Sequence, residues 1–310
     1  MGQRIGFIGL GNIGGGIAAN LIADGHELTV LDLDDRRTKL LVDAGARAAR
    51  NPAEVAGASA VTFLSLPSPQ AMEQVAHDWL GGASGDAVLV DLSTNAPSTI
   101  RRIGGQVVGA GRRFLECPLT GGAPGARMRM LLFICGGERD TYDEVGPLLD
   151  TIGRARFWLG PLGCGNVGKL VNSLMAFAAT WVSMEGLAMG ARSGVDLRTL
   201  VEMMRVAGAT NFYIERMVEG INERGRPTDF ALELAAKDAG LIVELARDLA
   251  VPVPVAGAVE QVMVMAKGLG LGDRDWSDLV EVMERLTDVK LHLPPKPEEQ
   301  DAADGGAAAT

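Results

Sequence analysis

The first half of the chain alternates short apolar runs, rich in β-branched residues, with segments whose apolar positions recur at helical spacing. Some of these runs, such as VTFLSL at 61–66 and VLVDL at 88–92, are apolar almost without interruption. Strands of this kind are typical of a parallel sheet with helices on both faces. The pattern therefore predicts a doubly wound α/β domain. The predicted strands are 4–10, 28–32, 60–66, 87–91, 113–117, 131–136 and 156–159.

Beyond Gly165 the strand-like runs end, and segments at helical spacing follow one another to about Leu291. An all-α second domain is therefore predicted. It opens with a long helix, about Val167–Arg192, whose near-continuous apolarity predicts burial on most sides. Such a helix either bridges the two domains or lies in a subunit interface, and we expect a homodimer or homotetramer.

The end of the chain contains three prolines and no apolar periodicity, which predicts a disordered tail. The predicted domains are therefore 1–162, 163–291 and the tail at 292–310.

Two apolar stretches resemble membrane or targeting segments. The uncharged run 5–23 holds six glycines, which indicates a turn against a ligand and not a signal peptide. The 15 uncharged residues 170–184 are fewer than the roughly 20 that span a bilayer. We therefore expect no membrane partner.

Composition narrows the possible partners. With 47% apolar residues, the chain can bury two cores, and its net charge of −10 disfavours binding to nucleic acid or anionic lipid. The three cysteines lack CxxC spacing and the three histidines are widely separated. A small-molecule ligand, no metal site and a reducing cytoplasm are the resulting expectations.

The segment GLGNIG at 9–14 follows a predicted strand and opens a predicted helix. In a dinucleotide site, Gly9 would allow the tight turn, Gly11 would let the backbone approach a pyrophosphate, and Gly14 would let helix and strand pack closely. An acid, Asp32, ends the next strand 23 residues past Gly9. Although a purely structural glycine turn is the alternative, this context favours a dinucleotide.

The acid also indicates which dinucleotide binds. Asp32 can accept hydrogen bonds from the adenosine ribose diol, whereas Asp32 and Asp34 would repel a 2′-phosphate. NAD is therefore expected over NADP. Arg36 and Arg37 leave NADP open, because a guanidinium can bind a phosphate, although both also fit a solvated first helical turn.

Taken together, several blocks of the sequence resemble the β-hydroxyacid dehydrogenases, which include 3-hydroxyisobutyrate dehydrogenase and are related to 6-phosphogluconate dehydrogenase. The resemblance covers about residues 4–286. It implies a Rossmann-type N-terminal domain and an all-α C-terminal domain, joined by a long interdomain helix and flanking a cleft. The matching blocks are GFIGLGNIGGGIAANLIADGHELTVLD at 6–32, LP at 66–67, DLSTNAP at 91–97, ECPLTGGAPGA at 116–126, GCGNVGKLVN at 163–172 and FALELAAKD at 230–238.

The resemblance also implies roles for individual residues. Lys169 matches the lysine that transfers a proton, and two sets of residues match the substrate and cofactor sites. The substrate residues would be Thr120, Gly121, Gly122, Asn172 and Ser173. The cofactor residues would be Gly9, Gly11, Asn12, Ile13, Gly14, Asp32, Leu66, Pro67, Thr94 and Lys237.

The chain departs from the family pattern at two places. Ser173 stands where a second asparagine is usual, four residues after Lys169 and on the same side of the helix, so extra room or a bridging water is implied. Arg129-Met130 replaces Gly-Thr just beyond the substrate loop. Arg129, with Arg127 nearby, either recognises a larger or doubly anionic substrate or is an ordinary loop arginine.

The predicted function is that of an NAD-dependent oxidoreductase acting on a 3-hydroxy acid, with hydride transfer between nicotinamide and the carbinol carbon. Lys169 would be the general base in oxidation and the general acid in reduction. Imine or carbonyl reductases of similar architecture and a non-catalytic dinucleotide-binding module are the alternatives. Retention of Lys169 argues against both.

Overall fold

The computed structural model describes residues 2–295, which form two compact units. Among these residues, unit 1 comprises 2–172 and Glu244–Val251, and unit 2 comprises Ser173–Val243 and 252–295. The division falls inside one long helix, and not at its beginning as the predicted domain bounds have it.

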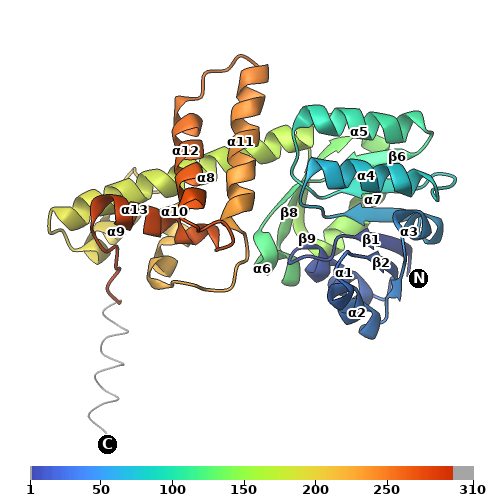
Figure 1. Cartoon of the computed structure of the whole chain (residues 1–310), viewed down its shortest axis with the longest axis horizontal. Coiled ribbons are helices and arrows are strands. Elements are labelled where there is room, and N and C mark those ends of the chain that lie inside the picture. Colours follow the sequence, from blue (N-terminus) through green and yellow to red (C-terminus); the bar gives the residue numbers. More distant parts are fainter. Residues whose placement is uncertain (1, 296–310) are drawn as a thin grey trace, which may run out of the picture. The chain divides into compact units, whose positions relative to one another are not determined.

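Unit 1 is built on a nine-stranded sheet (Figure 1). Its strand order is β3-β2-β1-β4-β5-β6-β8-β7, and β9 pairs with β8. From β3 to β6 the strands are parallel and follow the 3-2-1-4-5-6 order of dinucleotide-binding folds, while β8 is antiparallel to β6. The strands are β1 (Arg4–Ile8), β2 (Glu27–Leu31), β3 (Arg47–Ala48), β4 (Val61–Leu64), β5 (Val88–Asp91), β6 (Arg113–Glu116), β7 (Leu119–Thr120), β8 (Leu131–Gly137) and β9 (Gly153–Trp158).

All the predicted strands are present, and the prediction of a doubly wound sheet is confirmed. The two strands absent from the prediction, β3 and β7, have two residues each, too few to show a period-2 pattern.

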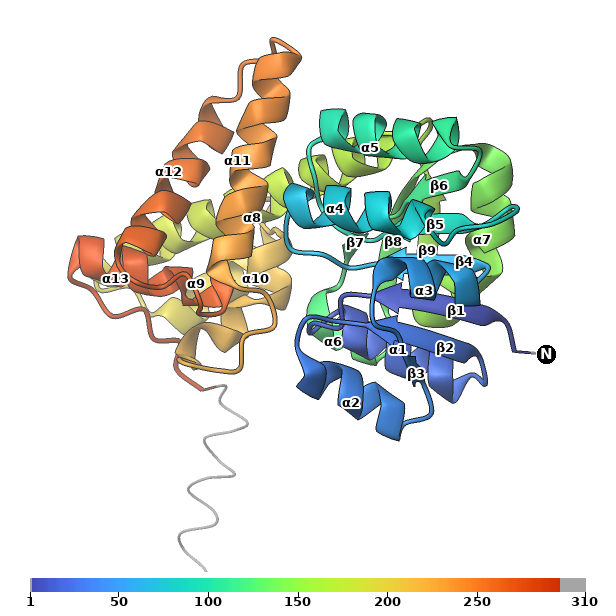
Figure 2. The same ribbon diagram turned by 45° about the vertical axis from the view of Figure 1, so that its right-hand side comes forward.

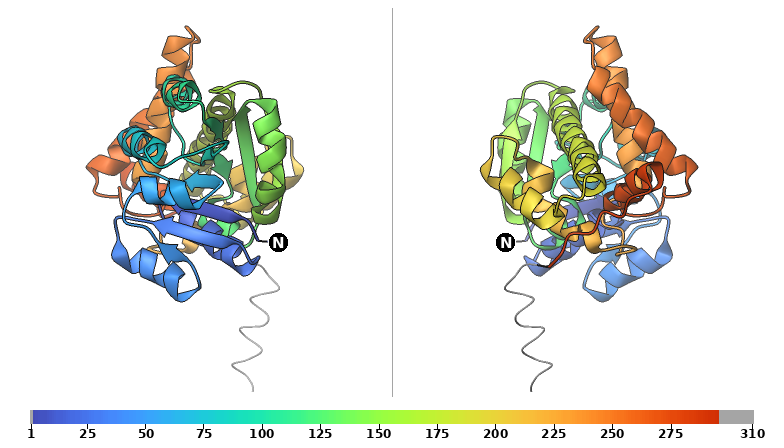
Figure 3. Two further views of the ribbon diagram at one scale, coloured as in Figure 1. Left: turned by 90° about the vertical axis from the view of Figure 1, so that its right-hand side faces the viewer. Right: turned by 90° about the vertical axis from the view of Figure 1, so that its left-hand side faces the viewer.

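Helices cover both faces of this sheet (Figures 2 and 3). One buried apolar cluster joins the sheet to α1, α2, α6 and α7, and a second joins it to α3, α4 and α5. Two covered faces explain why the central strands are apolar without alternation. The helices are α1 (Gly14–Ala23), α2 (Asp35–Asp43), α3 (Pro52–Ala58), α4 (Pro69–Leu80), α5 (Pro97–Gly109), α6 (Gly122–Arg127) and α7 (Arg139–Ile152).

The carboxyl ends of the central strands are in register. Ile8 pairs with both Leu31 and Leu64, Leu64 pairs with Asp91, and Asp91 pairs with Glu116. The loops that follow β1, β2, β4, β5 and β6 therefore leave one edge of the sheet, where ligands bind in open α/β folds.

Unit 2 is helical, as predicted, and α11 and α12 run side by side in it (Figures 1 and 2). Lys267 of α12 pairs with Glu233 of α11 at 3.7 Å. The long helix and the elements after it are α8 (Cys164–Arg192), α9 (Leu197–Val206), α10 (Phe212–Arg216), η1 (Val218–Asn222), α11 (Leu232–Asp248), α12 (Pro254–Gly268), η2 (Trp276–Leu279) and α13 (Val280–Thr287).

The long helix α8 differs from its prediction in two respects. It begins at Cys164, three residues before the predicted start, and it is not buried on most sides within one chain. A row of apolar side chains stays exposed along one face: Val171, Met175, Val182 and Met189. Among the described residues, α8 alone is long and apolar enough to cross a membrane, but 39% of its most apolar window is buried, and core helices meet the same criteria.

Ordered packing continues past the predicted end of the second domain at 291. Leu293 is buried and exchanges two backbone hydrogen bonds with the Asn222 side chain, while Arg198 donates to the Pro294 carbonyl. The predicted tail therefore starts too early, because these backbone contacts leave no periodic pattern in the sequence. Residues 296–310 of that tail lie outside the described residues.

Candidate active site

The turn between β1 and α1 requires its glycines for separate reasons. Gly9 has a φ of 91°, and a Cβ there would lie 2.3 Å from the Ser65 carbonyl oxygen. A Cβ on Gly14 would lie 2.0 Å from the Gly9 carbonyl oxygen. At Gly11, by contrast, a Cβ would meet only a guanidinium nitrogen of Arg37 at 3.9 Å. Gly9 and Gly14 therefore serve the packing of the turn, whereas Gly11 keeps open a surface that a pyrophosphate can approach.

The first turn of α1 can receive an anion. Its N-cap is Ile13, which offers no side-chain acceptor, and the turn contains no acid. Asn12, just before it, is exposed. Unpaired helical N–H groups and the positive end of the helix dipole favour a phosphate there.

Asp32 follows β2 and is fixed by the backbone. Its Oδ2 accepts from the Leu10 N–H at 2.6 Å, and its Oδ1 accepts from the Asp34 N–H at 2.8 Å. The carboxylate, with its side chain 10% exposed, is thus held beside the glycine turn with lone pairs left for a diol.

The two arginines that follow, Arg36 and Arg37, differ in how closely they pair with nearby carboxylates. Arg36 forms a bidentate pair with Asp34, with Nε–Oδ1 at 3.0 Å and Nη2–Oδ2 at 2.9 Å, and it lowers the pKa of that carboxyl. Arg37 lies 3.9 Å from Asp32 and from Asp34. Arg37 is therefore the more available of the two for a phosphate.

The loops after β4 and β5 are tied together. The Leu66 N–H donates to the Ser93 hydroxyl at 3.0 Å, and the Ser93 N–H donates to the Asp91 carboxylate at 3.1 Å. Two predicted cofactor residues, the exposed Pro67 and the half-buried Thr94, lie next to these groups in the chain. This network places both predicted loops at the sheet edge that carries the glycine turn.

The predicted substrate loop follows β7. Gly121 and Gly122 have φ values of 122° and 62°, which favour glycine, and Thr120 ends the strand with its side chain half-buried. The loop leads into the short helix α6, whose N-cap Gly121 supplies no side-chain acceptor. Backbone N–H groups and a hydroxyl in this arrangement suit a carboxylate.

The start of α8 is fastened by a buried carboxylate. Glu116, fully buried at the end of β6, accepts from the Gly165 N–H at 3.1 Å, the Asn166 N–H at 3.0 Å and Asn166 Nδ2 at 2.6 Å. The Gly163 N–H also donates to it. These bonds draw the glycine-rich segment into the helix, which explains why α8 begins earlier than its apolar pattern predicts.

A second buried acid, Asp91, lies beside Glu116 in the sheet register. The pKa of Asp91 is raised to about 7, chiefly by burial and also by the Glu116 charge, while the hydrogen bonds from Ser93 act in the opposite direction. Burial also raises the pKa of Glu116. No motif in the sequence points to a role for either acid. Each is the last residue of a buried apolar strand, and this position is the signal by which the sequence could have indicated them.

Lys169 lies three residues after Asn166 on α8 and is half-buried. Asn172 is exposed and Ser173 is 2% exposed. Lys237, on α11, pairs with Asp238 at 3.1 Å. Ser173 and Lys237 belong to unit 2, whereas the other predicted site residues belong to unit 1.

The Arg129 guanidinium forms hydrogen bonds and an ion pair within unit 1. Its guanidinium donates to both oxygens of Asp24, at 2.7 and 2.8 Å, and to the Thr151 carbonyl at 2.9 Å. It thus joins the loop after α6 to α1 and α7, which favours the structural interpretation over substrate recognition. Arg127 ends α6 and is exposed.

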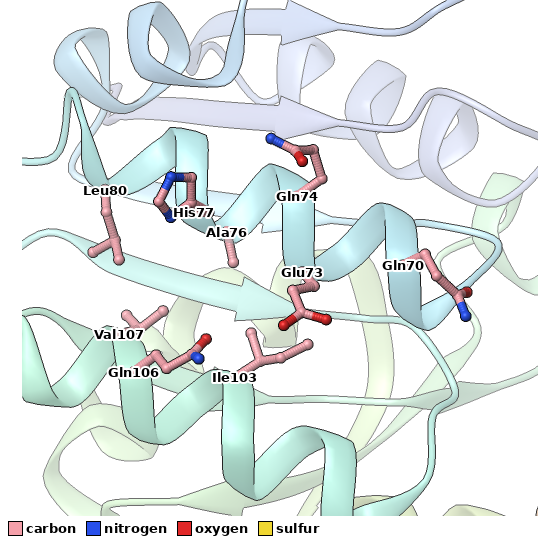
Figure 4. A pocket seen from close by; sticks show the side chains of 9 residues that line it. All are labelled: Gln70, Glu73, Gln74, Ala76, His77, Leu80, Ile103, Gln106 and Val107. Carbon is pink, nitrogen blue, oxygen red and sulfur yellow. The ribbon is translucent and has the colours of Figure 1, made fainter.

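A hollow of unit 1 lies between the outer helices α4 and α5 (Figure 4). Its lining comes from those helices and not from the carboxyl edge of the sheet: Gln70, Glu73, Gln74, Ala76, His77, Leu80, Ile103, Gln106 and Val107. It is therefore not the candidate active site. Within residues 2–295, no group of three or more His, Cys, Asp or Glu side chains could hold a metal ion.

Comparison with known proteins matches both halves of the chain. Residues 4–160 match the NAD binding domain of 6-phosphogluconate dehydrogenase, and residues 163–283 match the NAD-binding domain of NADP-dependent 3-hydroxyisobutyrate dehydrogenase. Among solved structures, a 3-hydroxyisobutyrate dehydrogenase of Mycobacterium tuberculosis with L-serine has the same fold, with a TM-score of 0.84 at 21% identity over 91% of this chain and 99% of that one.

Two enzymes are similar in sequence to this chain over nearly their whole length. The 2-(hydroxymethyl)glutarate dehydrogenase of Eubacterium barkeri is 29% identical over 93% of this chain and 97% of its own. The glyoxylate/succinic semialdehyde reductase 1 of Arabidopsis thaliana is 30% identical over 91% of this chain and 99% of its own. The chain therefore belongs to the β-hydroxyacid dehydrogenases, a family of NAD(P)-dependent oxidoreductases.

Proposed function

We propose that this family member moves a hydride between NAD and the carbinol carbon of a 3-hydroxy acid, with Lys169 as the acid–base group. One observation carries the proposal. The start of α8, which bears Lys169, is fastened by buried hydrogen bonds to the sheet edge from which the dinucleotide turn leaves. Cofactor-binding loops and a proton-transferring side chain on one edge suit a dehydrogenase.

The fit of the cofactor rests on unit 1. The uncapped first turn of α1 would bind the pyrophosphate over Gly11, and the Asp32 carboxylate would accept from the adenosine ribose hydroxyls. When bound, the nicotinamide supplies the hydride acceptor or donor. NAD is proposed over NADP because Asp32, fixed by two backbone N–H groups, would repel a 2′-phosphate.

The chain's own residues supply the proton transfer and the substrate contacts. In oxidation, the Lys169 amine takes the proton of the substrate hydroxyl; in reduction, its ammonium returns one to the forming hydroxyl. Thr120, Gly121 and Gly122 would hold the substrate carboxylate. Carboxylated compounds are also what the similar enzymes are named for: 2-(hydroxymethyl)glutarate, glyoxylate and succinic semialdehyde.

The assembly is proposed to be a homodimer or homotetramer in the cytoplasm. Support comes from the exposed apolar face of α8, on which Met175 and Met189 are 68% and 72% exposed. A second copy covering this face would remove that apolar surface from water.

Replacement of the lysine tests the activity. Lys169→Ala should lower kcat by about 10²–10⁴ on the best hydroxy acid of a panel, because positioned acid–base catalysis contributes that much. NADH affinity, measured by fluorescence titration, should stay nearly unchanged, since the proposed dinucleotide contacts lie elsewhere. Lys169→Arg should restore little, because a guanidinium does not deprotonate at working pH. Lys267→Ala, on α12, is the matched control and should keep full turnover.

Retention by Lys169→Ala of more than about a tenth of wild-type turnover would contradict the acid–base assignment. Another donor would then be needed. Tyr213 is a poor candidate, because it is 3% exposed and burial raises the pKa of its hydroxyl above the ordinary value. Ser173 would be tested first.

A further inference from the structure

Glu116 occupies a site that is built for a carboxylate. A Cβ on Gly136 would lie 2.3 Å from Glu116 Oε1, and a Cβ on Gly165 would lie 3.0 Å from its Cδ. Side chains at either glycine would thus displace the carboxylate. Three backbone N–H groups and one side-chain amide donate to its two oxygens, so the fully buried group is satisfied.

The same carboxylate reaches a second loop through Asn166. Asn166 Nδ2 donates to Glu116 at 2.6 Å, while Asn166 Oδ1 accepts from the Asn95 N–H at 2.8 Å. Asn95 is 1% exposed and follows Thr94, a proposed cofactor residue. One buried acid therefore fixes both the start of α8 and the loop after β5.

The start of α8 needs such an anchor. Its segment contains Gly163, Gly165 and Gly168, and glycine loses more backbone freedom than any other residue when it is ordered. The first N–H groups of a helix also have no intrahelical acceptor. The Glu116 carboxylate supplies acceptors for two of these N–H groups, of Gly165 and Asn166, and for the N–H of Gly163 just before the helix. It also places a negative charge at the positive end of the helix.

We infer that Glu116 is a positioning residue that, through Asn166 and the first turn of α8, holds Lys169 in place for proton transfer. This inference rests on the proposed function of Lys169. Lys169 lies three positions after Asn166, an axial rise of about 4.5 Å and nearly one turn. A loosened first turn would therefore move the lysine directly, and misplacement of a reacting group by about 1 Å can cost roughly 10²-fold in rate.

The test is a double-mutant cycle with Glu116→Gln, which keeps the shape and removes two acceptor lone pairs and the charge. We expect kcat to fall at least tenfold while the Kd for NADH changes less than threefold. In the Lys169→Ala background, Glu116→Gln should change the residual kcat less than twofold, because two residues that act as a unit are not additive. Glu116→Asp, which keeps the charge, should recover part of kcat.

A second readout does not depend on turnover. Amide hydrogen exchange of residues 163–170 should accelerate in Glu116→Gln. Trp79→Phe is the matched control, since it removes a buried hydrogen bond to Thr62 in unit 1. It should lower Tm without changing kcat or the exchange of 163–170, which separates positioning from a general loss of stability.

The outcomes distinguish this inference from the proposed function. If Lys169→Ala keeps more than about a tenth of wild-type turnover, both the acid–base role of Lys169 and the positioning role of Glu116 are contradicted. Three results would overturn the role of Glu116 alone, provided that Lys169→Ala is inactive. They are full kcat in Glu116→Gln, additive effects of the two substitutions in the cycle, and unchanged hydrogen exchange of residues 163–170 in Glu116→Gln. If Glu116→Gln does not fold, Asn166→Ala removes one donor, keeps the carboxylate, and carries the same expectations and the same overturning results.

Discussion

The backbone N–H of Leu10 donates a hydrogen bond of 2.6 Å to Oδ2 of Asp32. Leu10 belongs to the glycine turn after β1, and Asp32 follows β2, so this bond joins the two loops that would hold opposite ends of an adenosine diphosphate. The carboxylate cannot turn away from an incoming ribose without leaving a backbone donor unpaired. We therefore expect the contact between these two loops to determine the choice between NAD and NADP.

NAD should be preferred over NADP by at least tenfold in kcat/KM. A phosphate beside the fixed Asp32 carboxylate should cost more than about 1.4 kcal/mol, which is one decade in rate. Asp32→Asn keeps one acceptor for Leu10 and removes the charge, so it should narrow the preference. Steady-state kinetics with both cofactors checks this, with Asp35→Asn as the matched control. Equal turnover of wild type with NADP would instead assign a phosphate to Arg37.

The stability of the chain should depend on pH through Asp91. Its pKa is about 7 in the fold and 3.8 is the ordinary value, so the folded state holds the extra proton between these limits. The stabilisation from this group is complete below pH 3.8 and is lost as pH rises through 7. Relative to Asp91→Asn, wild type should therefore lose up to about 1.4 kcal/mol of unfolding free energy per pH unit in that window.

Urea unfolding at pH 5, 6, 7 and 8 measures this difference between wild type and Asp91→Asn. The difference should change most between pH 5 and 7 and level off above about 8. Asp86→Asn, at an exposed acid just before β5, controls for a charge change alone. A difference that does not vary with pH would show that Asp91 is ionised throughout.

Arg129 should contribute to the stability of the fold and not to substrate binding. Its bidentate pair with Asp24 is partly exposed, with the two side chains 36% and 26% accessible, so we expect a coupling of about 1 kcal/mol in a cycle of Arg129→Ala and Asp24→Ala. Because the left-handed φ of 59° costs most residues energy, Arg129→Gly should be less destabilised than Arg129→Ala. A KM for the hydroxy acid that rises tenfold in Arg129→Ala would restore the substrate role.

Light scattering at micromolar concentration should give two or four times the chain mass of 32.5 kDa. Met175→Glu places a charge on the exposed apolar face of α8 and should shift the protein toward monomer. Val206→Glu, at a 90% exposed position at the end of α9, is the control and should leave the mass unchanged. A wild-type protein that is monomeric at this concentration would contradict the proposed assembly through α8.

Local patterns predicted much of the fold and indicated a candidate cofactor site. Continuous apolar strands require a sheet covered on both faces, and the spacing of Gly9, Gly11, Gly14 and Asp32 is that of a βαβ unit closing on a pyrophosphate. These features depend on backbone conformation and on neighbours close in the chain, which a sequence records directly. The resemblance to the family added Lys169 and the substrate loop, neither of which periodicity could identify.

Only the tertiary structure revealed the buried acids and the arginine pair. Glu116 and Asn166 are 50 residues apart in the chain, and their contact exists because β6 ends beside the start of α8. Arg129 and Asp24 are 105 residues apart, and their ion pair favours a structural role for Arg129 over substrate recognition. The sequence by itself determined which segments become strands and helices and where the dinucleotide turn lies. Which acids are buried, which guanidinium is already bound and where α8 begins were decided by long-range packing, because burial and hydrogen bonding depend on neighbours that the chain order does not reveal.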